Sequence, residues 1–404
     1  MRRDPHHRRV LCLNGYGNNL GDQAIFAGFL KVFLAATEAA ELEVTLDQSF
    51  IYGFPFRPET IATVNEHYDL VVLAGGGFIY HRPHDGSASG WGFDIPEELI
   101  PTLRVPYAIY STGYNYRAFA EERFPPQTAS HLRATVRHAA HFSVREHGSM
   151  RILREEYGVT DPIDFVPDAA LHVQPIHAHL PQLDPDRPSI GLCLRLDRAD
   201  ERFPPPFAES FEHYVRTLVE SMRRQVVEEG CQVVFTPHLL TKTDVEVGAL
   251  LKQSLPAGSV VLLHEAIPSL YGPASLELPG VLAGVYRRLD TVLGQRLHSL
   301  ILPFAVGTPV VSITSTESSA WMQEEFGMPS WMHLDISRPE RDVTVERITS
   351  ALWRARYERE ELSLHALERR AVLAMQARRA TAKMVETTLA LPETILPPLQ
   401  AVAP

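Results

Sequence analysis

The stretch Asp290–Ile313, DTVLGQRLHSLILPFAVGTPVVSI, decides the fold. Its start, Asp290–Leu293, predicts a short buried strand, and its end, Thr308–Ile313, is rich in β-branched residues and predicts a second strand. Between the two, apolar residues recur at helical spacing over Leu297–Ala305, and a glycine follows as a helix stop. The stretch therefore predicts a strand–helix–strand unit of a parallel α/β sheet.

Gly294, Arg296 and His298 lie in this unit where the first strand gives way to the helix. Ligands bind at that edge of an open parallel sheet because unpaired helix amides and the helix dipole favour an anion there. Arg296 adds a fork of donors for phosphate or carboxylate, and His298 adds a group that exchanges protons near neutral pH. For such a pair taken alone, a structural role at the sheet edge is an equal alternative. We interpret the pair as the candidate reaction centre.

Length and composition predict two globular domains. A chain of 404 residues is too long for one ordinary domain, and 22% charged with 45% hydrophobic residues is typical of soluble proteins. The net charge of −11 argues against a nucleic-acid partner, which would require a basic surface. Cys12, Cys193 and Cys231 lie in apolar runs too far apart for a zinc site, which predicts reduced thiols and a cytoplasmic location.

The start of the chain, MRRDPHHRR, is basic, but no apolar secretory segment follows it. We expect residues 1–9 to form a disordered tail, with peripheral contact to an anionic membrane as the weaker alternative. No stretch approaches the roughly 20 apolar residues that cross a bilayer, so no transmembrane segment is expected. The sequence does not indicate the oligomeric state.

Residues 10–171 predict a first Rossmann-like domain, because strands alternate with helices. Its first strand leads into GYGNNLGDQ, a turn before a helix in which Asn18 and Asp22 offer polar contacts. This turn matches neither a Walker loop nor a dinucleotide fingerprint. A later strand runs into a triple glycine, whose Gly76 and Gly77 would let another group approach the backbone closely.

A polar loop, Phe78–Trp91, follows the triple glycine and carries His81, His84 and Asp85. We expect these side chains to contact an acceptor substrate or solvent. A metal site is the less favoured alternative because the loop lacks the helical frame that fixes metal ligands. Farther along, Arg145 follows another strand and precedes a helix, as Arg296 does, with a structural salt bridge as its equal alternative.

Residues 172–189, rich in proline and histidine, predict the interdomain linker, and residues 190–340 predict a second Rossmann-like domain that contains the Arg-Leu-His motif. Strand ends in this domain carry Arg195 and His238. Residues 341–390 predict helices that pack across both domains with Trp353 and Leu364 as anchors, and residues 391–404 form a proline-rich tail.

These motifs, taken in order over residues 10–327, resemble the polysaccharide pyruvyl transferase family. The matching pieces are NNLGDQAI (18–25), the glycines 75–77, SVRE (143–146), PDAA (167–170), the strand ending at 195, TPH (236–238) and GQRLHSLILPFAVGTPVV (294–311). The resemblance implies two Rossmann-like doubly wound domains that face a cleft, as in GT-B glycosyltransferases, with a C-terminal helical segment. It also implies transfer of a pyruvyl group from phosphoenolpyruvate, as a ketal, to hydroxyls of a saccharide or glycoconjugate acceptor. No metal and no cofactor other than this co-substrate are implied.

The resemblance also implies roles for individual residues. His298 would be the general acid that protonates the donor, and Asp22 would be a second catalytic group on the opposite wall. The donor would be held by Arg145, Arg296, Arg195, His238 and Asn18. The acceptor would meet Gly76, Gly77, His81, His84 and Asp85.

One departure from the family pattern is the residue Ser318, where family members commonly carry a lysine that grips the donor. Arg195, His238 or no residue at all could replace that cation. Two other functions stay open. A glycosyltransferase of the same architecture would use a nucleotide sugar, although the second domain has no clear acidic residue to hold a ribose. A non-catalytic protein would bind a glycan or a phosphorylated metabolite.

Overall fold

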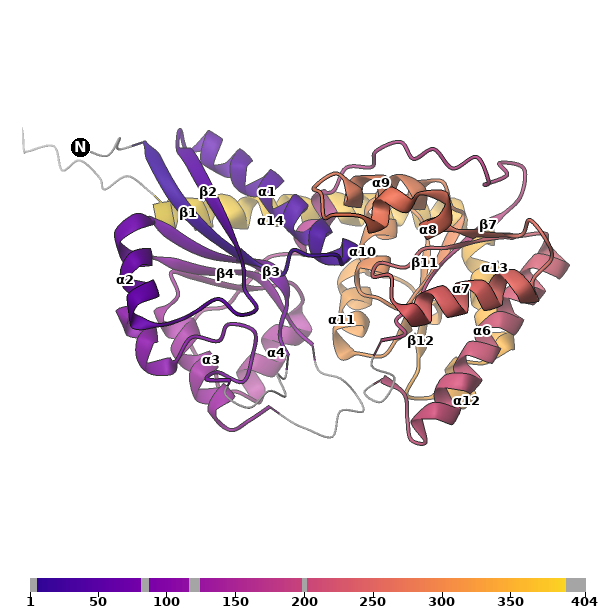
Figure 1. Cartoon of the computed structure of the whole chain (residues 1–404), viewed down its shortest axis with the longest axis horizontal. Helices are drawn as coiled ribbons and strands as arrows, with labels where there is room; N and C mark the ends of the chain where they lie inside the picture. Colours follow the sequence, from indigo (N-terminus) through magenta and orange to yellow (C-terminus); the bar gives the residue numbers. More distant parts are fainter. Residues whose placement is uncertain (1–5, 81–86, 116–123, 198–201, 390–404) are drawn as a thin grey trace, which may run out of the picture.

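The structure is a computed structural model that describes residues 6–80, 87–115, 124–197 and 202–389. The chain forms two lobes side by side along its longest axis, each built around a parallel six-stranded sheet (Figure 1). The predicted acceptor residues His81, His84 and Asp85 lie outside the described residues. The predicted α/β class with two doubly wound domains is confirmed.

The first sheet has the strand order β2-β1-β3-β4-β5-β6, so the chain turns back at β1 and continues outward from β3. Its strands are β1 (His7–Asn14), β2 (Glu43–Phe50), β3 (Leu70–Ile79), β4 (Tyr107–Tyr114), β5 (His141–Val144) and β6 (Asp164–Phe165). The helices of this domain are α1 (Leu20–Ala39), α2 (Pro58–His67), α3 (Gln127–His138) and α4 (His147–Glu155), with the 3₁₀ turns η1 (Glu97–Thr102) and η2 (Ala169–His172).

The second sheet has the order β12-β11-β10-β7-β8-β9, with its switch of direction between β7 and β10. Its strands are β7 (Ser189–Cys193), β8 (Gln232–Phe235), β9 (Val260–Leu262), β10 (Thr291–Gly294), β11 (Val310–Thr314) and β12 (His333–Asp335). The helices are α6 (Phe207–Glu229), α7 (Lys242–Ser254), α8 (Leu263–Ala266), α9 (Leu278–Arg287), α10 (His298–Ala305), α11 (Glu317–Phe326) and α12 (Pro339–Asp342), with η3 (Pro268–Tyr271) and η4 (Ser330–Met332).

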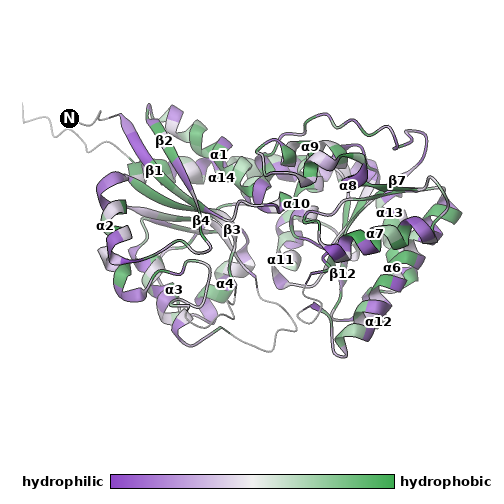
Figure 2. Cartoon of the chain, in the orientation of Figure 1, coloured by the Kyte–Doolittle hydropathy of each residue, from purple (hydrophilic) through white to green (hydrophobic). Residues whose placement is uncertain are grey.

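The central strands of the first sheet are buried on both faces, as a parallel sheet covered by helices requires, whereas the edge strand β2 is half-buried or exposed along its length. In β1, Leu11 and Leu13 join one hydrophobic cluster, whereas Val10 and Cys12 join another on the opposite face. The hydrophobic strands inside the helical layers are visible in Figure 2. These near-continuous apolar runs leave the strand ends as the places where polar side chains gather.

The C-terminal helices α13 (Val345–Tyr357) and α14 (Arg359–Leu389) complete the chain, and α14 runs behind both lobes (Figure 1). Ala366 and Leu373 of α14 pack with the α9 and α10 side of the core, and Met384 packs with α1 and β1. The predicted anchors were wrong, because Trp353 is 47% exposed and Leu364 is 60% exposed. The buried contacts of α14 are made by Ala366, Leu373 and Met384 instead.

Helix α1 is long and apolar enough to span a membrane by length and composition, and no other helix within the described ranges meets that test. The sequence interpretation did not anticipate this feature. The finding is weak support for a membrane span because 61% of the apolar window is buried inside the protein. Phe29 and Phe33 of this helix, for example, are fully buried in the first domain.

One expected boundary differs from the structure, and the expected linker is packed against the protein. Strand β1 begins at His7, so the end of the expected tail belongs to the sheet, and Arg9 pairs with Asp47 across to β2 at 2.7 Å. The expected linker contains no helix or strand between η2 and β7, but it packs firmly against the protein, with Leu180 and Leu183 buried.

Candidate active site

The candidate site lies where the carboxyl ends of strands from both sheets meet α1. The amino end of α1 belongs to the first domain but contacts the second, since the Leu20 amide donates to the carbonyl of His238 at 2.9 Å. Strands β1 and β3 on one side, and β7 and β10 on the other, end at the switch points of their sheets. Such points are where doubly wound folds bind ligands.

Gly21 in the first turn of α1 lies against the imidazole of His298, the first residue of α10. Asn19 caps α1 by accepting from the Gly21 amide at 2.9 Å. A Cβ atom at Gly21 would lie 2.6 Å from Nδ1 and 2.9 Å from Cγ of His298. The glycine is therefore required because the ring of a residue from the other domain occupies the space of a side chain.

A carboxylate, a guanidinium and an imidazole meet beside this contact. Oδ2 of Asp168 accepts from Nη1 of Arg145 at 3.2 Å and lies 3.5 Å from Nε2 of His298. Within the described part of the chain, Nε2 of His298 makes no hydrogen bond, so Asp168 is its ion-pair partner at the limit of hydrogen-bond distance. Burial raises the pKa of Asp168, but His298 and Arg145 lower it further, to about 2. Asp168 is thus ionised at any working pH.

Arg145 is buried, and its guanidinium lies against glycine residues. A Cβ at Gly113 would lie 2.4 Å from its Nε, and a Cβ at Gly77 would lie 3.3 Å from its Nη2. Gly76 has φ +126°, a conformation that other residues rarely adopt. The glycine run therefore bends the backbone and makes room for a guanidinium, which differs from the acceptor contact predicted for Gly76 and Gly77.

Glu146, next along the chain, is fully buried beneath Arg145. Its Oε2 accepts from Nε of Arg145 at 3.1 Å, and its Oε1 accepts from the Ser149 hydroxyl at 2.5 Å. Burial raises the pKa of Glu146 to about 7 although Arg145 and Ser149 act to lower it. This buried carboxyl group therefore changes its charge near neutral pH.

Arg296 is held by groups from the end of β7. Its Nε donates to the carbonyl of Leu194 at 3.1 Å, and its Nη2 donates to Oδ1 of Asp197 at 2.7 Å. The other oxygen of Asp197 accepts from Nη2 of the buried Arg202 at 3.1 Å. Burial raises the pKa of Asp197, but the arginines around it, Arg296 first, hold it well below its usual range. The sequence interpretation missed Asp197 and Arg202, although Asp197 follows the predicted strand-end residue Arg195 by two positions.

Asp22 faces the same space from α1. Burial raises its pKa, and four nearby groups act to lower it, namely His298, Arg145, Arg296 and Arg195. Asp22 forms no ion pair within 4 Å with any residue in the described ranges. The structure therefore brings together five of the predicted site residues, while Asn18 is exposed in the turn before α1.

His238 and Arg195 differ in what they can contribute. The ring of His238 is buried and hydrogen bonds the Tyr286 hydroxyl through Nε2 at 2.7 Å. Burial, then the charges of His298 and Arg296, lower the pKa of His238 well below its usual value. A neutral His238 cannot replace the family's lysine as a cation, which argues against its predicted role. Arg195 stays half-buried at the carboxyl end of β7.

Ser318, at the position of that lysine, is buried in the first turn of α11, with its hydroxyl 3.2 Å from that of Thr316. The hydroxyl of Ser315 is also buried and has no hydrogen-bond partner in the described structure. Because β11 pairs with β10, this helix start lies at the same sheet edge as Arg296. Neutral donors and helix amides stand where the family resemblance led us to expect a lysine.

The described residues include no group of three or more His, Cys, Asp or Glu side chains placed to hold a metal ion.

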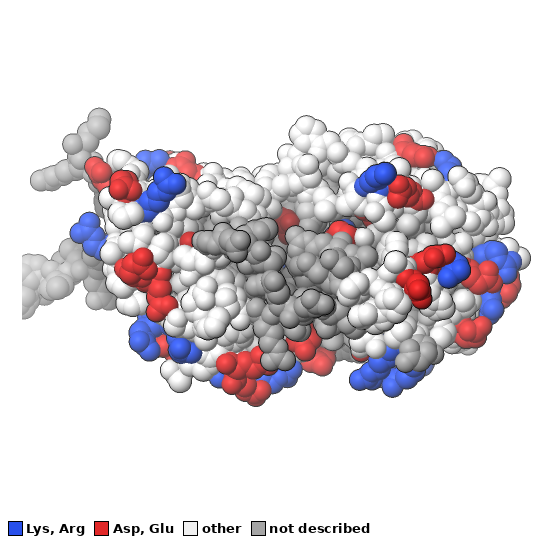
Figure 3. Space-filling model, turned by 60° about the horizontal axis from the view of Figure 1, so that its bottom comes forward, with Lys and Arg blue, Asp and Glu red and all other residues white. Residues whose placement is uncertain are grey.

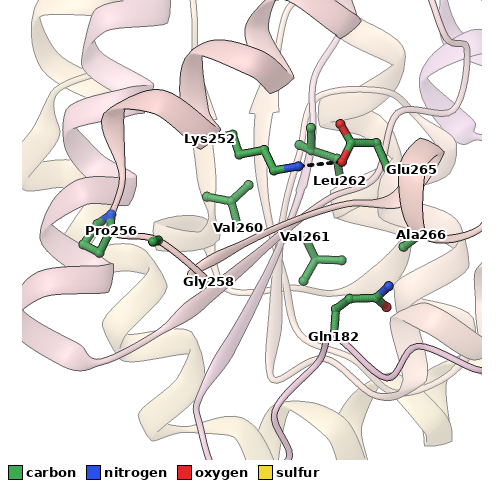
Figure 4. Close-up of a pocket in the computed structure, with 10 residues that line it drawn as sticks. Gln182, Lys252, Pro256, Gly258, Val260, Val261, Leu262, Glu265 and Ala266 are labelled. Atoms are coloured by element: carbon green, nitrogen blue, oxygen red, sulfur yellow. Dashed lines mark hydrogen bonds and ion pairs between the residues drawn. The ribbon is translucent and has the colours of Figure 1, made fainter.

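The cavity drawn in Figure 4 has a volume of about 680 Å³ and lies along the edge strand β9, outside the site. Lys252 and Glu265 pair across it at 2.6 Å and are both half-exposed. On the face in Figure 3, charged residues gather mainly over the outer parts of the two lobes. Nothing in this cavity matches the convergence of buried charges around His298.

Comparison with known proteins gives a family and a fold. The family model described as "Polysaccharide pyruvyl transferase" matches residues 19–317, well over half of the chain. No curated protein matches the sequence. Among solved structures, the S. aureus MnaA–UDP co-structure is similar with TM-score 0.54 and 10% identity, covering 90% of this chain and 91% of that chain. A putative UDP-N-acetylglucosamine 2-epimerase from Listeria monocytogenes has TM-score 0.54 and 14% identity, covering 89% and 91%. At these identities the likeness concerns the GT-B-like fold alone.

Proposed function

The chain belongs to the polysaccharide pyruvyl transferase family, and we propose that its donor is phosphoenolpyruvate and that His298, Arg145 and Arg296 carry the reaction. The pyruvyl group would be joined as a ketal to two hydroxyls of a saccharide or saccharide-like acceptor. The observation that carries this proposal is the Asp168 carboxylate, which contacts Arg145 of its own domain and His298 of the other.

The reaction needs a proton on the methylene carbon of the enol phosphate. Protonation by His298 makes that carbon a methyl group and leaves an oxocarbenium centre at the neighbouring carbon, which an acceptor hydroxyl attacks with loss of its proton. Phosphate then departs with the C–O bonding electrons and takes up the proton of the first hydroxyl. A second hydroxyl attacks the same carbon, and its proton returns to His298. The carboxylate of Asp168 lies 3.5 Å from Nε2 of His298 and places a negative charge beside the ring.

The donor's two anionic groups need cationic or amide-rich partners. Among the described residues, Nη2 of Arg145 and Nη1 of Arg296 have no hydrogen-bond partner, so each guanidinium keeps donors for a ligand while carboxylates fix its orientation. The unpartnered Ser315 hydroxyl and the amino end of α11 would serve in place of the missing lysine.

Asp22 suits the role of general base for the acceptor hydroxyls. Its pKa is raised by burial, which makes the carboxylate a better proton acceptor. It faces His298 across the site, so proton donor and proton acceptor approach the reacting carbon from different helices. The three unpaired, buried cysteines suit a reducing compartment, and we propose a cytoplasmic enzyme.

The test is incubation of the purified protein with phosphoenolpyruvate and a panel of free, nucleotide-linked and lipid-linked sugars. Phosphate release should depend on one acceptor class, and the acceptor should gain the mass of a pyruvyl ketal. A parallel arm replaces phosphoenolpyruvate with nucleotide sugars. Sugar transfer in that arm, with no phosphate release in the first, would contradict the proposal. Ligand-induced stabilisation without any product in either arm would identify a binding protein instead.

A further inference from the structure

Three cations gather around η2, the short helix capped by Asp168 of the active site. Arg370 of α14 donates through Nε to the carbonyl of Leu171 in η2 at 3.2 Å. On α1, a Cβ at Gly28 would lie 1.9 Å from the carbonyl of Ala169, so this helix face is pressed against η2. Lys31 follows Gly28 by three residues and therefore lies on the same face. Arg378, two turns after Arg370, completes the group, which we call the cationic cluster.

The cationic cluster has no acidic partner. In the described ranges, Lys31, Arg370 and Arg378 form no ion pair. Burial and then the charges of Arg370 and Arg378 lower the pKa of Lys31, and burial and then Arg378 lower the pKa of Arg370. The three charges are thus close enough to repel one another. Because the whole chain carries a net charge of −11, they are not the by-product of a basic composition.

His172 lies beneath the cationic cluster at the end of η2. The residue is 2% exposed, and its Nε2 has no hydrogen-bond partner in the described structure. Burial, followed by Arg378, Arg370 and Lys31, lowers its pKa to about 4, so the ring is neutral at physiological pH. An unsatisfied buried nitrogen beside three unpaired cations is costly unless another group completes the arrangement.

We infer that Lys31, Arg370, Arg378 and His172 form a binding site for a phosphate group, separate from the active site. An anion would offset the repulsion among the three cations and accept hydrogen bonds from the guanidinium groups. Exposed apolar side chains border the cluster on the same two helices, with Leu34 46% exposed, Leu367 45% exposed and Met375 44% exposed. Apolar side chains next to cations favour a phospholipid headgroup over a free phosphate as the source.

The experiment uses the full chain and a triple variant, Lys31→Gln with Arg370→Gln and Arg378→Gln. Arg379→Gln is the matched control, because it removes one charge from the same exposed helix without touching the cluster. Hydrogen exchange is followed in peptides from α14 with and without inorganic phosphate. These peptides separate this site from phosphate bound near His298, whereas η2 directly follows Asp168 of the active site. Sedimentation with phosphatidylcholine vesicles, with and without phosphatidylglycerol, tests the lipid source.

We expect phosphate, or vesicles that contain phosphatidylglycerol, to slow exchange in α14 of the natural chain and of Arg379→Gln. Each guanidinium removed should weaken binding about tenfold or more. Without phosphate, the triple variant should melt close to the temperature of the natural chain, because relief of the repulsion offsets the loss of the hydrogen bond from Arg370 to Leu171. A response to free phosphate alone would identify a soluble ligand, and a response to vesicles would identify a membrane. Equal responses of the natural chain and the triple variant, or no response to either probe, would overturn the inference. Arg378→Gln alone, at an exposed position, repeats the test if the triple variant is unstable.

Discussion

Replacing Gly21 with alanine places a methyl group directly against the proposed general acid. The new Cβ would lie 2.6 Å from Nδ1, 2.9 Å from Cγ and 3.1 Å from Cβ of His298. Ordinary contact begins near 3.4 Å, and rotation of the ring cannot relieve the clash with the Cβ of His298. The imidazole must therefore retreat from α1 by close to 1 Å, and a displacement of about 1 Å in a catalytic group can lower turnover about 10²-fold.

The same substitution should leave the fold intact. Alanine in a helix is more favourable than glycine by about 1 kcal/mol, which offsets part of the strain at the contact. Gly17→Ala is the matched control, because a Cβ there would meet only the Gly15 carbonyl at 3.8 Å. The assay is steady-state pyruvyl transfer together with thermal melting of both variants. If Gly21→Ala retained the natural turnover, or if Gly17→Ala lost as much, the placement of His298 against α1 would be refuted.

Three further substitutions test other parts of the structure. Glu146→Gln removes a carboxyl group whose pKa is raised from 4.5 to about 7 by burial. Between these two values the folded chain binds more protons than the unfolded chain, so the natural chain loses stability as the pH rises. The difference in melting temperature between Glu146→Gln and the natural chain should therefore shift in favour of the variant between about pH 5 and about pH 8. Asp197→Asn removes the anchor of Arg296 at 2.7 Å, so the KM for phosphoenolpyruvate should rise about 10- to 100-fold with a smaller change in kcat; an unchanged KM would contradict the donor role of Arg296. Gly148→Ala would set a Cβ 1.9 Å from the Trp321 ring of the other domain, and urea unfolding should show a loss of about 1–3 kcal/mol from overpacking.

The alternation of strands and helices could be predicted from the sequence because most central strands, such as β1, β3 and β10, contain buried apolar runs, and apolar residues recur at helical spacing between them. The edge of the sheet on which Arg145, Arg296 and His298 gather followed from that alternation, since the carboxyl ends of parallel strands share one side. The anchors of α13 and α14 could not be predicted from the size of single residues. Trp353 of α13 is large and apolar but half-exposed, whereas the small Ala366 of α14 is buried.

The partners of the site residues were less accessible to prediction because they depend on distances between segments far apart in the chain. Asp168 and His298 are 130 positions apart in sequence and come together only when α1 joins the two domains. The buried pair of Asp197 and Arg202 carries no local signal beyond its place after a strand. In the sequence, His172 is one of several histidines in an irregular segment. Only the fold places it near Arg370 and Arg378 of α14.

The central claim is that His298 donates the proton that starts the transfer. The most direct measurement compares His298→Gln with the natural chain in single-turnover transfer and in equilibrium binding of phosphoenolpyruvate. If His298 donates the proton, turnover of His298→Gln should fall about 10²- to 10⁴-fold, while the dissociation constant of phosphoenolpyruvate stays nearly unchanged. An unchanged rate of transfer in His298→Gln would contradict it.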